Sequence, residues 1–108
     1  MPIRQLHESE VTATIAETAV PVVIDFWAAW CGPCRAVAPQ VERIADAYGD
    51  RVLVVGVDID AAPSVAAAFG VRSIPTIMRF DRGAPTATII GAHPAETIVH
   101  ALGIPPLA

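Results

Sequence analysis

Hydrophobic positions divide the chain into short, nearly continuous apolar runs and longer stretches with helical spacing. Residues 22–27, apart from Asp25, and residues 52–57 are apolar at successive positions and rich in β-branched residues, which predicts two strands buried on both faces. Between them, Val37, Val41 and Ile44 begin an apolar stripe that predicts a helix from about residue 31 to Tyr48.

Weaker patterns predict the other elements. These are a strand at 3–6, a helix at about 9–18, a helix opened by Pro63 and closed by Gly70, a strand at 76–80, a turn at 81–83, a strand at 86–90 and a helix from Pro94 to about Leu102. Helices separate the early strands, and only the last two strands are close enough to form a hairpin. We therefore predict an α/β fold, with a mixed five-stranded sheet and four helices distributed over both faces.

Composition narrows the class of protein. With 108 residues, 54% hydrophobic and 17% charged, the chain is expected to form a single compact domain over 1–108. Its net charge of -4, with seven scattered arginines and no lysine, argues against nucleic-acid binding. Residues 1–7 lack the apolar core of a signal peptide, and Asp25 interrupts the longest apolar run, so we expect a cytoplasmic protein, monomeric by default.

The only two cysteines, Cys31 and Cys34, stand three positions apart at the start of the predicted helix at 31–48. A helix N-terminus favours a thiolate over a thiol, which suits redox chemistry. Zinc would need a second pair of ligands, and the three histidines are isolated, so no metal site is expected. A structural disulfide remains an alternative, although a loop this short would stabilise the fold only weakly.

Asp25 is a carboxylate inside an apolar strand. Desolvation there would raise the pKa of Asp25 toward the range useful for proton transfer, so that it could accept the proton of Cys34. The alternative is an aspartate at the strand end that faces water. Phe26 and Trp27, its neighbours in the strand, are expected in the core.

The segment at 25–35, with Trp30-Cys31-Gly32-Pro33-Cys34 at its centre, resembles the active-site signature of the thioredoxin family. Pro39 resembles the proline that kinks the family's helix. Later landmarks occur in the family's order at 58–60, 71–76, Gly83 and 91–92, so the resemblance covers nearly the whole chain. It implies the thioredoxin fold and protein-disulfide reductase activity.

The resemblance also implies a role for each residue at the motif. Cys31, at the exposed start of the helix, would attack a partner's disulfide, and the less exposed Cys34 would resolve the mixed disulfide. Gly32 would permit close approach of the partner backbone. Pro33 would preform the first helical turn and keep the pair reducing.

A docking surface follows from the same resemblance. The Ile74–Pro75 bond would be cis and face the cysteines, where an extended substrate segment pairs with backbone. This weakly apolar surface would comprise Trp30, Gly32, Pro33, Ile59, Ile74, Pro75, Gly91 and Ala92.

Two positions depart from the family pattern. Gly56 stands where the family often has a lysine beside the buried aspartate, and the missing cation should raise the pKa of Asp25 further. Arg35 replaces a lysine and keeps its charge.

By resemblance, we expect a general protein-disulfide reductase that binds no cofactor. Its electrons would come from NADPH through a flavoprotein thioredoxin reductase, and reductases and peroxidases would be its substrates. An oxidase or isomerase of a secretory compartment is an alternative that the missing leader and the Gly-Pro dipeptide disfavour. A redox-independent binding subunit is another, and its binding would survive Cys31→Ser.

Overall fold

The computed structural model describes residues 3–107, and within them five strands form one mixed sheet in the order β1-β3-β2-β4-β5. The strands are β1 (Arg4–Gln5), β2 (Val22–Trp27), β3 (Leu53–Asp58), β4 (Thr76–Asp81) and β5 (Ala84–Ile90). The α-helices are α1 (Val11–Glu17), α2 (Gly32–Tyr48), α3 (Pro63–Ala68) and α4 (Ala95–Ala101). Strands β1, β3 and β2 run parallel, whereas β4 is antiparallel to both β2 and β5. The α/β fold predicted from the sequence is confirmed.

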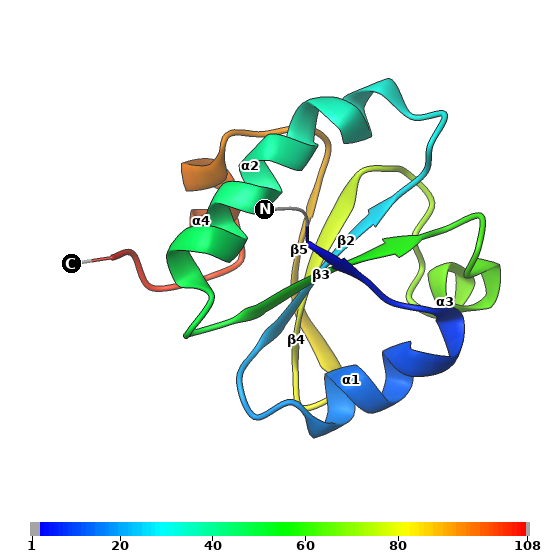
Figure 1. Cartoon of the computed structure of the whole chain (residues 1–108), viewed down its shortest axis with the longest axis horizontal. Coiled ribbons are helices and arrows are strands. Elements are labelled where there is room, and N and C mark those ends of the chain that lie inside the picture. Colours follow the sequence, from blue (N-terminus) through cyan, green and yellow to red (C-terminus); the bar gives the residue numbers. More distant parts are fainter. Residues whose placement is uncertain (1–2, 108) are drawn as a thin grey trace.

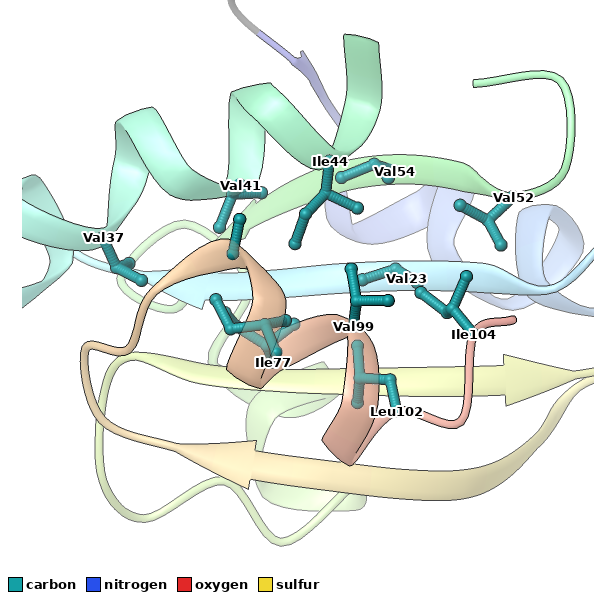
Figure 2. Packing of buried hydrophobic residues seen from close by; sticks show 12 residues of the cluster. Val23, Val37, Val41, Ile44, Val52, Val54, Ile77, Val99, Leu102 and Ile104 are labelled. Atoms are coloured by element: carbon teal, nitrogen blue, oxygen red, sulfur yellow. The ribbon is translucent and has the colours of Figure 1, made fainter. Parts of the chain in front are cut away.

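Helices cover both faces of the sheet, with α2 and α4 on one side and α1 and α3 on the other (Figure 1). Each face therefore has its own hydrophobic core. Figure 2 shows the core beneath α2 and α4, in which side chains of three strands meet both helices and the C-terminal segment. Its labelled members are Val23, Val37, Val41, Ile44, Val52, Val54, Ile77, Val99, Leu102 and Ile104.

The second core lies beneath α1 and α3. Ile24 and Phe26 of β2 and Phe80 of β4 are fully buried there, and Phe80 meets the ring of Phe69 edge to face at a centroid distance of 4.9 Å. Because successive side chains of a strand point to opposite faces, β2 contributes to both cores. This explains why its sequence is apolar at almost every position.

Two predicted boundaries were wrong. The helix expected at 9–18 is divided into a 3-10 helix, Glu8–Glu10, and α1, because the Glu10 carboxylate accepts the backbone N–H of His7 at 2.8 Å and caps the first turn. Strand β5 begins at Ala84, not at residue 86. Arg82 and Gly83 both have positive φ, which makes a tight two-residue turn and lets pairing start directly after it.

Trp27 also differs from the prediction. Phe26 is in the core, as expected, but Trp27 is only half-buried. It is the last residue of β2, and its indole N–H donates to Gln5 Oε1 at 2.7 Å on the face covered by α2. Trp27 therefore borders a pocket and does not fill the core.

The carboxyl end of β2 leads directly into α2. Residues 28–31 make the connection, so the first turn of α2 lies at the end of the central strand. Within residues 3–107, no helix combines the length and the apolar character needed to cross a membrane. The site below is built at this junction of β2 and α2.

Candidate active site

Cys31 and Cys34 form a disulfide at the start of α2, with their Cα atoms 5.3 Å apart. Cys31 is the N-cap residue of the helix, with an extended backbone, and its Sγ accepts the backbone N–H of Cys34 at 3.1 Å. Pro33 lies in the first turn, where its missing N–H costs no helical hydrogen bond. The helix end thus directs an N–H group at the Cys31 sulfur, which would stabilise negative charge there in the reduced protein.

The two cysteines are equally buried, with exposed fractions of 5% for Cys31 and 4% for Cys34. The expectation that Cys31 is the exposed one was wrong for this disulfide form. Its Sγ lies 3.7 Å from the carbonyl oxygen of Ile74, and both sulfurs pack in a small cluster with Ala28. Gly32 and Pro33, between the cysteines, are exposed. The two residues between the buried cysteines therefore form the solvent-facing part of the motif.

Trp30 presents the largest apolar surface beside the disulfide, with 67% of its surface exposed. Its indole N–H donates to Asp60 Oδ2 at 2.9 Å, and the Asp60 N–H donates to Asp58 Oδ1 at 2.9 Å. This chain of contacts fixes the ring to the loop after β3. The anchoring role of Asp60 was not predicted, because the sequence marked 58–60 only as a landmark.

The Ile74–Pro75 peptide bond is cis, and the Ile74 carbonyl faces Cys31. The carbonyl of Pro75 accepts the N–H of Gly91 at 2.9 Å, and Gly91 has a φ of 95°, which favours glycine. Ala92 follows and is exposed. Two segments far apart in the sequence therefore meet beside the disulfide.

Ile59 completes the surroundings of the pair. It is half-buried, packs against the cluster of the two cysteines together with Ile74, and its N–H donates to the Trp27 carbonyl at 2.9 Å. Of the residues predicted to form the docking surface, Ile59 and Ile74 pack against the cysteine cluster, whereas Gly91 and Ala92 are linked to it only through Pro75.

Asp25 is buried behind the disulfide, with only 5% of its surface exposed. Its Oδ1 has no hydrogen-bond partner within residues 3–107, and desolvation raises the pKa of Asp25 to about 7. Its neighbours across the sheet, Gly56 and Ile77, bring no charge. The alternative of an aspartate that faces water was therefore wrong.

Asp25 and Cys34 line one pocket of about 430 Å³ between the sheet and α2. Its walls are mainly apolar and include Ile3, Trp27 and Ala38. The shared pocket brings Asp25 and Cys34 to one cavity, which neither Gly32 nor Pro33 lines.

Gln5 also lines this pocket, although no motif or hydrophobic pattern singled it out. Its side chain stands over Gly56: a Cβ built on Gly56 would come within 2.4 Å of Gln5 Nε2. A glycine inside a buried strand marks close approach of another group, and this was the available signal. The position that the family resemblance associates with lysine is thus covered here by a neutral amide.

No metal site accompanies these groups. Within residues 3–107, no three side chains of histidine, cysteine, aspartate or glutamate gather closely enough to ligate an ion. The described site consists of a thiol pair, one buried carboxyl group and a weakly apolar rim.

Several known proteins are similar to this chain in sequence and in fold. The thioredoxin family model matches residues 2–103. Thioredoxin 1 of Synechococcus elongatus is 51% identical over 88 residues, 82% of each chain, and a chloroplastic M-type thioredoxin of Chlamydomonas reinhardtii is 53% identical over 85 residues, 79% of this chain and 61% of that one. A solved structure of thioredoxin from Malassezia sympodialis has a TM-score of 0.84 and 33% identity, over 94% of this chain and 91% of that one.

The sequence match, the fold and the Cys31–Cys34 pair all indicate the same family. The family model matches nearly the full length of the chain, and two of the relatives are 51% and 53% identical to it over the aligned residues. The chain belongs to the thioredoxin family and is a thiol-disulfide oxidoreductase.

Proposed function

We propose that this chain is a general reductase of protein disulfides that works through Cys31 and Cys34. The supporting observation is the N–H group of Cys34 directed at Cys31 Sγ from the start of α2. In the reduced protein this contact favours the Cys31 thiolate, which attacks one sulfur of a partner's disulfide. The partner's S–S bond breaks, a mixed disulfide with Cys31 forms, and the released partner sulfur leaves as a thiolate that takes up a proton.

The second step resolves the mixed disulfide. Asp25 accepts the proton of the Cys34 thiol, directly or through water in the pocket that both residues line. The Cys34 sulfur then attacks Cys31 Sγ, the Cys31–Cys34 disulfide forms, and the partner sulfur leaves as a thiolate that takes up a proton. Two electrons have passed from the dithiol to the partner.

The exposed rim would dock the partner. Trp30 offers an apolar face, Gly32 and Pro33 leave the approach to the sulfurs open, and the cis Ile74–Pro75 segment presents backbone to an extended chain. Ile59, Gly91 and Ala92 would extend this surface on its two sides.

Electrons would return from NADPH through a flavoprotein thioredoxin reductase, and the chain itself would hold no cofactor. This part rests on family membership, as do the assignments of reductases and peroxidases as substrates and of the cytoplasm as the compartment. A ferredoxin-dependent reductase is the competing electron source.

Replacing each cysteine separates electron transfer from binding. Cys31→Ser should abolish reduction of a protein disulfide such as that of insulin, because no nucleophile remains at the helix start. Cys34→Ser should instead accumulate the mixed disulfide, since resolution is lost. Mass spectrometry of alkylated, quenched reactions measures both outcomes. A Cys31→Ser variant that still reduces the substrate would contradict the proposal.

The electron source is tested by reconstitution. With NADPH and a flavoprotein thioredoxin reductase, the oxidised chain should support continuous NADPH oxidation in the presence of a disulfide substrate, followed at 340 nm. Cys34→Ser is the matched control and should give no turnover. Turnover that occurs only with reduced ferredoxin and its reductase would show that ferredoxin, and not NADPH, is the electron source.

Asp25→Asn should slow resolution of the mixed disulfide at pH 7 by about 10- to 100-fold. This effect is small for the loss of a general base, because some of the Cys34 thiol ionises without one. In the parent protein the rate should rise as the pH increases through about 7, where the Asp25 carboxyl group loses its proton. Rapid-quench kinetics give both profiles. Equal rates for the variant and its parent across pH 6–8 would remove Asp25 from the mechanism.

Burial of Asp25 also predicts a dependence of stability on pH. Its pKa is raised from 3.8 to about 7 in the folded protein, so the folded state holds an extra proton between these values. Unfolding therefore becomes easier as the pH rises from about 4 to about 7, and this effect is level above that range. Asp25→Asn should therefore stabilise the oxidised protein at pH 8 by a few kcal/mol, about 4 at most, and have little effect below about pH 4. Urea unfolding at both pH values measures this. A variant that is less stable than its parent at pH 8 would show that the buried carboxylate does not destabilise the fold.

A further inference from the structure

Gln5, Gly56 and Asp25 lie opposite one another on three adjacent strands. In the register of the sheet, Gly56 of β3 pairs with Gln5 of β1 on one side and with Asp25 of β2 on the other. Gln5 and Asp25 both line the pocket beneath α2, so their side chains project from the same face. Because Gly56 has no side chain, nothing from β3 stands between them.

The side chain of Gln5 crosses this gap to reach β2. Its Oε1 accepts the indole N–H of Trp27 at 2.7 Å, and a Cβ on Gly56 would lie 2.4 Å from its Nε2. The contact also determines which way the amide points. An indole N–H is a donor only, so it must meet the oxygen of the amide, and the two N–H donors of Nε2 remain above Gly56.

Gln5 shares its pocket with an unpartnered acceptor. Asp25 Oδ1 has no hydrogen-bond partner within residues 3–107. Strand β3 separates Gln5 from Asp25, but the Gln5 amide lies over Gly56, which is one strand away from Asp25. Neighbouring strands lie about 4.8 Å apart, a separation that one water can bridge by accepting from Nε2 and donating to a carboxylate. The pocket of about 430 Å³ has room for such water.

We propose that Gln5 is a positioning residue for Asp25: Trp27 holds its amide above Gly56, and the amide N–H, acting through a bridging water, stabilises the carboxylate of Asp25. This inference deepens the proposed function and rests on the role of Asp25 as proton acceptor. Gln5 touches neither the cysteines nor the substrate in this account, and acts only through the carboxyl group.

Other charged groups facing the pocket do not supply this stabilisation. Helix α2 brings Cys34, Arg35 and Glu42 to the lining, and no residue of β3 lines the pocket. The Arg35 guanidinium donates to the Ala29 carbonyl at 2.8 Å, and Glu42 has an interaction of its own. Burial is the cause of the raised pKa of Asp25.

The direct test is a pH titration of the Asp25 carboxyl group, followed by NMR at its carboxyl carbon. It uses the full-length chain without substrate, in both the reduced and the oxidised form. Gln5→Met keeps the length of the side chain and removes the amide, so the titration midpoint should rise by about half a pH unit. Gln5→Glu should raise it further, because a second carboxylate faces the pocket. Gln40→Met is the matched control: this glutamine lies on α2, accepts the Ala95 N–H and is absent from the pocket lining, so its loss should leave the midpoint unchanged.

A double-mutant cycle of Gln5→Met and Gly56→Ala separates the effect of the Gln5 amide on the Asp25 midpoint from the effect of desolvation. The new methyl group should displace the amide of Gln5 and raise the midpoint in the parent, but have much less effect in the Gln5→Met background, where no amide remains to be displaced. An equal shift in both backgrounds, or an unchanged or lowered midpoint in Gln5→Met, overturns the proposal.

The rate of mixed-disulfide resolution provides the second readout. Its pH profile should shift with the NMR midpoint in Gln5→Met, whereas a merely structural role would change stability and leave the profile in place. Because the NMR titration uses no substrate, failure of the disulfide-reductase assignment and failure of the Gln5 assignment give different results.

Discussion

The burial of β2 from Val22 to Phe26 is the constraint on which the site depends. This strand pairs with β3 on one edge and β4 on the other, and hydrophobic cores cover both of its faces. Its burial fixes the point at which the chain leaves the sheet and enters α2, so the cysteine pair is held on a rigid framework. It also forces Asp25 out of water, since any side chain at that position lies between the sheet and α2.

Two opposite electrostatic environments result within one pocket and its rim. At the start of α2, an N–H group is directed at Cys31 Sγ and favours negative charge on sulfur. Behind the pair, Asp25 lies in a mainly apolar pocket that disfavours negative charge on oxygen. The first environment suits a nucleophilic thiolate and the second a carboxyl group that exchanges its proton near neutral pH. Gln5 adds an uncharged donor to this second environment, where Gly56 leaves space for it.

Much of this arrangement could be predicted from the sequence, because it depends on local pattern. Apolar runs marked β2 and β3, and the spacing of Cys31 and Cys34 after a buried strand marked the redox pair. The family resemblance added the cis bond before Pro75, which spacing alone does not reveal. These features need only a few neighbouring residues to be recognised.

What escaped prediction depends on contacts between distant segments. Cys31 is buried because the Ile74 carbonyl lies against its sulfur, and Trp27 is only half-buried because it borders the pocket at the end of β2. Gln5 became visible as part of the site only through the register of three strands, since its partners Trp27 and Gly56 are far away in the chain. Burial and side-chain direction at such positions are properties of packing, which hydrophobic periodicity does not encode.

The most direct test of the central claim is the reduction potential of the Cys31–Cys34 pair. The protein would be equilibrated in graded dithiothreitol redox buffers, and its free thiols counted by alkylation and mass spectrometry. A disulfide reductase should give a reversible two-electron transition more negative than about −230 mV, below the range of glutathione-linked carriers. A potential of about −180 to −120 mV, as in isomerases and oxidases, or a pair that never equilibrates with the buffer, would contradict the account.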